Sequence, residues 1–148
     1  MFNKAIYLDM DGTIASLYDV ENWLEKLQAH DASPYEVAAP CLKMQPLARL
    51  LNQLQKAGYI IGIISWLSKT STPEYDEQVA QAKLKWLSVH LKSVQFDEIH
   101  IVEYGVPKST LAKCPMGILF DDNEEIRKEW KGKTYEPNVM LDILRALK

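Results

Sequence analysis

The 148-residue chain has little cysteine and no strong bias toward one charge, and both absences limit what the protein can be. Its 2 cysteines, Cys41 and Cys114, lie far apart and form no C-x-x-C or Cys/His cluster. We therefore expect neither a disulfide framework nor a zinc site. With 17 Lys and Arg residues against 20 Asp and Glu residues, the formal net charge is -3. That balance predicts no stable nucleic-acid binding and no attraction to an anionic membrane.

Long hydrophobic runs are also missing. The longest apolar stretch, residues 60–67, is far shorter than the roughly 20 residues that span a bilayer. Asp9 interrupts the first apolar run before the core of a signal peptide could be completed. These features predict no membrane association, and together with the sparse cysteine they favour a cytoplasmic location.

The composition is that of a soluble globular domain, with 47% hydrophobic and 25% charged residues. A chain of this length can bury roughly 68–70% of its unfolded surface, which leaves room for one core and not for two. We therefore expect a single domain over residues 1–148.

Short apolar runs alternate with helical patterns along the chain. The runs predict buried strands at 5–8, 60–64, 99–102 and 117–120, and a short last strand at 133–135. Helices are predicted behind Pro46 at 47–54, at 77–91, at 123–130 and at 138–147. Such alternation predicts an α/β fold, namely a three-layer Rossmann-like domain with a mainly parallel sheet of about five strands.

Details of three helical segments can be predicted as well. Asn123 and Asn138 are suited to be N-caps of the last two helices. The helix at 77–91 is expected to bury a face that includes Val79, Leu84, Leu87 and Leu91. Residues 68–73, before that helix, have the composition of a polar loop.

A small insert is predicted after the first strand, over residues 14–44. A helix is expected from Asp19 to His30 with Asp19 as N-cap, followed by a turn at 31–34 and a short segment to Pro40. The insert is too short for a second domain, so we expect it to cover the edge of the sheet.

Carboxylates and a hydroxyl follow the predicted strands. Asp9 and Asp11 follow the first strand, Ser65 the second, and Asp121 and Asp122 the fourth. In parallel sheets these carboxyl ends share one edge, where ligands bind. Taken alone, Asp9 and Asp11 could equally belong to a turn, and Asp121 and Asp122 to the N-cap region of a helix. Four carboxylates at one edge repel each other unless they hold a cation, and oxygen ligands suit Mg²⁺.

These residues carry a resemblance to a known family. The strand followed by Asp9-Met10-Asp11-Gly12-Thr13, then Ser65, Lys108 and Asp121-Asp122, resembles the four-motif signature of the haloacid dehalogenase (HAD) superfamily. The resemblance extends over residues 5–122. Within the superfamily, residues 83–87 and 96–99 resemble the small 5′-deoxyribonucleotidase-like branch. The resemblance implies a HAD-like hydrolase domain with a minimal cap.

The resemblance also implies roles for the acidic residues. Asp9 would be the nucleophile that forms an aspartyl-phosphate, and Asp11 the general acid and base. Aspartate at this second position is a feature of the superfamily's phosphatases. The side chains of Asp9 and Asp122 and the backbone carbonyl of Asp11 would hold Mg²⁺, with Asp121 acting through water.

Ser65 and Lys108 are the implied phosphate ligands, each with an alternative. Ser65 could simply end a strand, and Lys108 could occupy the first turn of a solvated helix. Lys113 is the rival motif lysine, but Lys108 lies nearer the end of the strand at 99–102. Trp66 is a candidate to stack on a substrate. The aromatic residues of the insert are more simply explained by packing.

The predicted function is therefore a Mg²⁺-dependent phosphomonoester hydrolase for a small phosphorylated substrate, with nucleoside monophosphates among the candidates. Two alternatives are a phosphatase for a nucleic-acid end or phosphoprotein, and a phospho-accepting receiver-like module. A catalytically dead binding relative ranks last, because no motif residue is missing. In receiver domains the acidic pair follows the first strand and the phospho-acceptor a middle one. Here the second acidic pair comes late, after the lysine. The sequence leaves open whether two chains form a homodimer that excludes water from the site.

Overall fold

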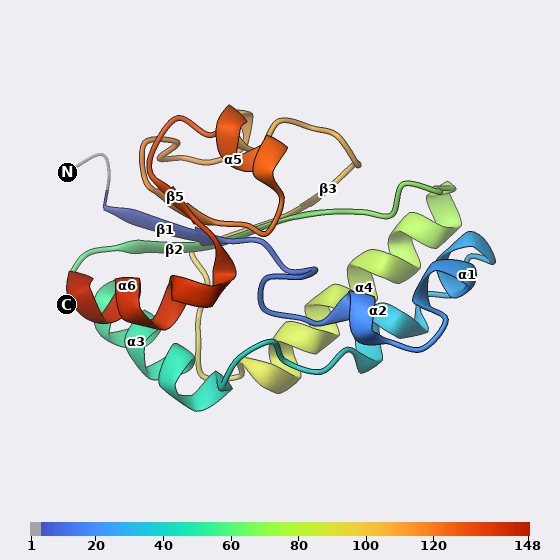
Figure 1. Cartoon of the computed structure of the whole chain (residues 1–148), viewed down its shortest axis with the longest axis horizontal. Coiled ribbons are helices and arrows are strands. Elements are labelled where there is room, and N and C mark those ends of the chain that lie inside the picture. Colours follow the sequence, from blue (N-terminus) through green and yellow to red (C-terminus); the bar gives the residue numbers. More distant parts are fainter. Residues whose placement is uncertain (1–3) are drawn as a thin grey trace.

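The computed structural model describes residues 4–148, and its centre is a sheet of five parallel strands in the order β3-β2-β1-β4-β5 (Figure 1). The strands are β1 (Ala5–Leu8), β2 (Ile60–Trp66), β3 (Glu98–Val102), β4 (Ile118–Phe120) and β5 (Thr134–Tyr135). The predicted α/β class and parallel Rossmann-like sheet are thus confirmed.

The strands are apolar throughout because both faces of the sheet are covered. Ile6 and Leu8 of β1 belong to the larger core cluster, whereas Ala5 and Tyr7 point into the smaller cluster on the opposite face. The larger core lies under α3 (Met44–Lys56), α4 (Pro73–His90) and α6 (Met140–Leu147). The smaller core lies under α5 (Glu124–Glu129) and part of the β3–β4 connection. The sheet is therefore the middle of three layers (Figure 1).

The order of the strands reverses beside β1. The chain moves outward from β1 through β2 to β3, and then returns to place β4 and β5 on the other side of β1. At such a reversal the connections leave opposite faces of the sheet, and a crevice opens at the carboxyl ends of the two strands. The crevice here lies between the end of β1 and the end of β4.

The insert after β1 differs in detail from the prediction. The expected helix from Asp19 to His30 with Asp19 as N-cap is wrong, since α1 spans only Trp23–Gln28. Asn22 stops it from beginning earlier because its φ of 57° lies in the left-handed region. The expected turn at 31–34 instead begins α2 (Ser33–Val37), with proline in the first turn.

Both insert helices pack on α4. Leu27 and Tyr35 form a separate cluster with Tyr75, Val79 and Ala82 of that long helix. The insert therefore packs against α4 beside the sheet, close to the reversal of strand order (Figure 1).

The ends of two other helices also differ from expectation. Helix α4 begins at Pro73, four residues earlier than predicted, because the Thr72 side chain caps it by accepting a hydrogen bond from the Tyr75 N–H at 3.2 Å. Asn123 caps α5 as predicted. Asn138 does not cap α6, because it lies in a 3-10 turn, Pro137–Val139, that precedes the helix.

The buried face of α4 is turned relative to the prediction. Leu84, which was expected in the core, is exposed, and Lys83 beside it is 1% exposed. Val79, Lys83, Trp86 and Leu87 lie on the buried face at helical spacing. Within residues 4–148, no helix combines the length and the apolar character needed to cross a membrane.

Candidate functional site

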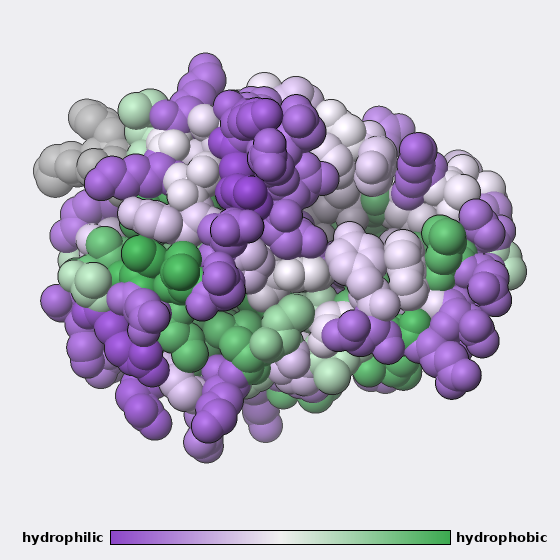
Figure 2. Space-filling view, viewed as in Figure 1, coloured by the Kyte–Doolittle hydropathy of each residue, from purple (hydrophilic) through white to green (hydrophobic). Residues whose placement is uncertain are grey.

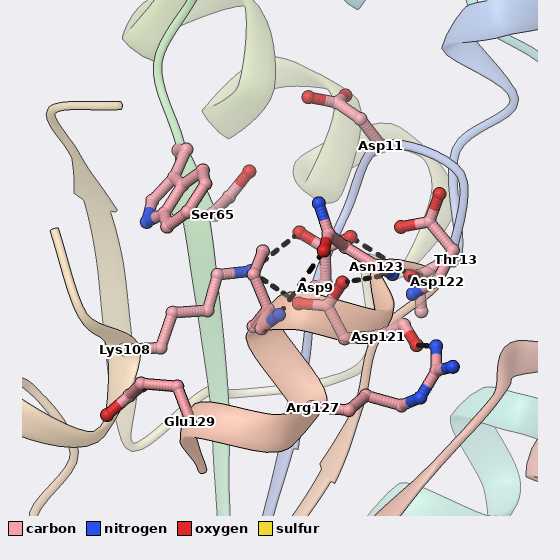
Figure 3. Close-up of polar contacts among 12 residues, drawn as sticks. Asp9, Asp11, Thr13, Ser65, Lys108, Asp121, Asp122, Asn123, Arg127 and Glu129 are labelled. Atoms are coloured by element: carbon pink, nitrogen blue, oxygen red, sulfur yellow. Dashed lines mark hydrogen bonds and ion pairs between the residues drawn. The ribbon is translucent and has the colours of Figure 1, made fainter. Parts of the chain in front are cut away.

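Asp9 and Asp121 lie side by side at the reversal of strand order, joined by a buried lysine. Asp9 directly follows β1, and its N–H donates to the Phe120 carbonyl at the end of β4 at 3.0 Å. Lys108 donates to Asp9 Oδ1 at 2.9 Å and to Asp121 Oδ2 at 2.8 Å (Figure 3). Lys108 is only 1% exposed. Its ammonium group is thus held between two carboxylates that are themselves largely out of water.

The turn after β1 fixes the second oxygen of Asp9. The chain turns sharply at Gly12, whose φ is +81°. That turn brings Thr13 back, so that its hydroxyl donates to Asp9 Oδ2 at 3.0 Å and accepts from the Asp122 N–H at 3.2 Å. Both oxygens of the Asp9 carboxylate are therefore oriented, one by Lys108 and one by Thr13.

The short 3-10 helix Lys108–Thr110, which carries Lys108, is anchored to α5. Ser109, the next residue, donates to the Glu129 carboxylate of α5 through both its N–H and its hydroxyl. Burial alone would lower the pKa of Lys108, but the charges of Asp9 and Asp121 outweigh burial and raise that pKa. Lys113, the rival lysine in the sequence, is exposed. The structure thus brings Lys108, and not Lys113, to the acidic residues.

Three carboxylates form a group with the spacing of a metal site. Asp9, Asp121 and Asp122 each offer an oxygen, and these oxygens lie within 4.8 Å of one another. Burial and the charge of Asp9 raise the pKa of Asp121 to about 6. Burial and the charges of Asp9 and Asp121 raise the pKa of Asp122 to about 7. The ionised cluster is unfavourable by itself, so a cation that replaces the shared protons would stabilise it.

Asp11 stands apart from that group. Figure 3 shows its carboxylate pointing away from Asp9, Asp121 and Asp122. Asp11 Oδ2 accepts a hydrogen bond from Lys83 at 2.9 Å. Burial raises the pKa of Asp11, and the charge of Lys83 offsets that rise only in part. Asp11 thus lies at the edge of the site, and its protonated form is more stable there than that of an aspartate in water.

Ser65 lies inside the end of β2, and the strand continues to Trp66 rather than ending before Ser65 as predicted. Its side chain is fully buried, and its Oγ accepts from Lys83 at 2.6 Å. The sequence prediction missed Lys83 altogether. The signal for it was present, since position 83 lies on the same helical face as Val79 and Trp86.

A cavity of about 450 Å³ opens above these residues. Its walls come from the insert, from the loop after β2, from the β3–β4 connection and from the start of α5. Figure 2 shows the surface hollowed between α5 and the insert, with walls of mostly intermediate hydropathy. The lining includes both members of two aromatic pairs: Tyr18 with Trp23, and Trp66 with Tyr104.

Trp66 is fixed at the wall of the cavity. Its indole N–H donates to the Val106 carbonyl at 2.8 Å, and its ring centroid lies 5.7 Å from the Lys108 ammonium. The insert aromatics were expected to serve packing, yet Tyr18 and Trp23 line the cavity as well. Arg127, by contrast, donates to the Asp121 carbonyl at 2.9 Å and so supports the loop that holds the carboxylates.

The charges of the site leave a deficit of positive charge. Asp11 pairs with Lys83, Asp9 and Asp121 pair with Lys108, and Asp122 lies beside Asp9 and Asp121, so four carboxylates share two ammonium groups. When all six groups are ionised, two negative charges remain. A divalent cation would balance them, and the oxygen-only donor set suits a hard cation.

The comparisons with known proteins add no family assignment: no protein-family model matches this chain, and no curated protein matches it significantly.

Proposed function

We propose that this protein is a Mg²⁺-dependent phosphomonoester hydrolase of the HAD type that acts through an aspartyl-phosphate on Asp9. The observation that carries the proposal is the setting of the Asp9 carboxylate. It lies at the base of a cavity, is oriented by Lys108 and Thr13, and adjoins a three-carboxylate group. A nucleophilic carboxylate needs such an orientation, together with nearby positive charge for the phosphoryl oxygens.

The residues of the site fit a magnesium ion. Asp9 and Asp122 are the carboxylates that would hold it, together with the backbone carbonyl of Asp11, and Asp121 would act through water. All these donors are oxygens, and when all six groups are ionised the four carboxylates outnumber the two buried lysines by two. When bound, Mg²⁺ would supply positive charge to the phosphoryl oxygens during the displacement.

In the first step an oxygen of Asp9 attacks phosphorus, and the bond between phosphorus and the leaving oxygen breaks. Asp11 gives its proton to that oxygen, so the alcohol leaves neutral. The raised pKa of Asp11 supports this role, because the group then carries a proton closer to neutral pH. Lys108, which lines the cavity, would stabilise the negative charge on the other phosphoryl oxygens, and Ser65 at the end of β2 would donate to one of them.

The second step releases the phosphate. Asp11, now ionised, accepts a proton from a water molecule as that water attacks phosphorus. The bond between phosphorus and Asp9 breaks, and inorganic phosphate and the free carboxylate of Asp9 are regenerated. One residue thus serves as acid and then as base.

The cavity supports a small substrate with a flat part. Its volume of about 450 Å³ is that of a small-molecule site. The Tyr18–Trp23 and Trp66–Tyr104 pairs offer flat apolar faces on two walls. A nucleoside monophosphate, with its base against these rings and its phosphate at Asp9, fits this combination.

The same features favour the hydrolase over its alternatives. A receiver-like module needs a phosphorylatable aspartate but no substrate cavity and no second carboxyl group for leaving-group protonation. The cavity volume of about 450 Å³ also favours a small ester over a nucleic-acid end or a phosphoprotein.

The proposal is tested by measuring phosphate release from a panel of substrates with Mg²⁺ and with a chelator in its place. The panel contains nucleoside monophosphates, sugar phosphates, phosphorylated oligonucleotides and a phosphopeptide. Mg²⁺-dependent turnover that is fastest on a nucleoside monophosphate supports the proposal. Turnover confined to the large substrates would support the macromolecular alternative, and no turnover on any substrate would contradict the hydrolase itself.

A further inference from the structure

Lys83 is a buried cation that the proposed chemistry leaves without a role. It lies in the middle of α4 and is 1% exposed, although lysine is among the residues least often buried. Tyr35 of the insert covers it, with the ammonium group 5.0 Å from the ring centroid. An ammonium group removed from water in this way needs partners for all of its hydrogens.

Each of the three hydrogens of Lys83 has a partner, and two of the partners are site residues. The ammonium group donates to Asp11 Oδ2 at 2.9 Å, to Ser65 Oγ at 2.6 Å and to the Trp66 carbonyl at 2.6 Å. One side chain thus joins the loop after β1 to the end of β2.

We propose that Lys83 is a positioning residue for phosphoryl transfer, which holds the Asp11 carboxyl group toward the leaving oxygen and turns the Ser65 hydroxyl toward the phosphate. The inference rests on the proposed function. It goes beyond that function by assigning a role to a residue that touches neither the substrate nor the cation.

The direction of the Ser65 hydroxyl follows from its bonding. A hydroxyl has one hydrogen to donate, and Lys83 already donates to the Ser65 oxygen. The hydroxyl hydrogen of Ser65 must therefore point to another acceptor. A phosphoryl oxygen at Asp9 is such an acceptor.

The position of Asp11 follows in the same way. Lys83 binds only Oδ2, so Oδ1 keeps its capacity to carry a proton to the substrate. Without Lys83 the Asp11 side chain would lose the ion pair that holds its carboxylate away from Asp9, Asp121 and Asp122. Proton delivery depends on such placement, because a small displacement of a catalytic group is enough to slow the reaction.

The test compares two substrates that differ in their need for a proton. 4-Nitrophenyl phosphate has a leaving group that departs without protonation, whereas an alkyl phosphomonoester from the panel needs the general acid. Lys83→Met is expected to lower kcat/KM on the alkyl ester by about 100-fold, the typical size of a general-acid contribution. On 4-nitrophenyl phosphate the loss is expected to stay below about tenfold, since only the Ser65 contact is affected.

Lys85→Met is the matched control, since Lys85 lies on the same helix with its ammonium group in solvent and paired to Glu36. It is expected to change neither rate. Equal losses on both substrates in Lys83→Met, or no loss, would overturn the inference while leaving the hydrolase intact. A wild-type protein that hydrolyses neither ester would overturn both.

A second variant keeps the test decisive if Lys83→Met does not fold. The double variant Lys83→Met/Asp11→Asn removes both charges of the pair and so leaves no unpaired carboxylate. For this variant and for Asp11→Asn alone, kcat/KM on the alkyl ester is divided by kcat/KM on 4-nitrophenyl phosphate, and the two ratios are compared. Because Lys83 acts on the leaving group through Asp11, the two ratios are expected to agree. A further loss confined to the alkyl ester would contradict the proposal.

Discussion

Replacement of Lys108 by methionine tests the electrostatics of the site through stability alone. The change keeps the length of the side chain and removes the charge that lies 2.9 Å from Asp9 and 2.8 Å from Asp121. The Asp121 side chain is fully buried, and that of Asp9 is 10% exposed. Breaking a buried pair from one side leaves an unpaired buried charge.

The expected loss can be estimated from that arrangement. Removing one partner of a buried ion pair costs about 3–5 kcal/mol, and here two carboxylates lose the same partner. We expect the metal-free Lys108→Met variant to be destabilised by at least about 3 kcal/mol at pH 8, where the carboxylates are ionised. Lys113→Met is the matched control, because Lys113 is exposed and a surface change costs within about 0.5 kcal/mol.

Urea unfolding followed by circular dichroism measures these losses. In an Asp121→Asn background, Lys108→Met is expected to cost clearly less, because one of the two unpaired charges is gone. Magnesium at about one hundred times its Kd is expected to raise the free energy of unfolding by about 2.7 kcal/mol, because it binds the folded state alone. A loss below about 1 kcal/mol for metal-free Lys108→Met, or the same loss in both backgrounds, would refute the reasoning.

Three further predictions concern the cation and the cavity. Gly12→Ala places a Cβ at a φ of +81° where it overlaps the Asp122 carboxylate, so Mg²⁺ affinity measured by calorimetry is expected to fall by about tenfold or more. Unchanged affinity would show that Asp122 is not a ligand. Mg²⁺ affinity is also expected to fall several-fold from pH 8 to pH 6, because protons bind the metal-free Asp122, whose pKa is about 7, and compete with the cation. Affinity that is the same at both pH values would contradict this assignment. Trp66→Ala is expected to raise KM for a nucleoside monophosphate by about tenfold while leaving KM for 4-nitrophenyl phosphate nearly unchanged, since only the nucleotide has a base to stack. Equal changes in both KM values would indicate that Trp66 only supports Lys108.

The sheet could be predicted from sequence because strands buried on both faces are continuous apolar runs. The β1 run has the same bounds in the structure as in the prediction. Strand β2 is longer than its apolar run because Ser65 and Trp66 pair with Ile101 and Val102 of β3. Pairing with a neighbouring strand is not visible in the local pattern, so the end of the strand was predicted too early.

The insert could not be predicted in detail because its helices are too short to be stable alone. They span 6 and 5 residues and depend on packing against α4. A local pattern of polar and apolar residues carries little information about such contacts.

In the candidate site, too, the positions set by strand ends could be predicted and those set by tertiary contacts could not. Asp9 and Asp121 meet because two strands carry them to one edge, and their positions after apolar runs predicted this. The contact between Lys83 and Asp11 depends instead on how α4 is rotated over the sheet. The burial of Lys83 in place of Leu84 reverses the usual preference for an apolar side chain, and only the three-dimensional contacts explain it.

The central claim is that the Asp9 carboxylate performs the chemistry, and the rate of hydrolysis by wild type and Asp9→Asn tests it most directly. The amide keeps the shape and the contact with Thr13 but is not a nucleophile. With Mg²⁺, the account predicts phosphate release by the wild type and a rate lower by on the order of 10⁴ or more for Asp9→Asn, with an unchanged circular dichroism spectrum. A folded Asp9→Asn variant that releases phosphate at the wild-type rate would contradict it.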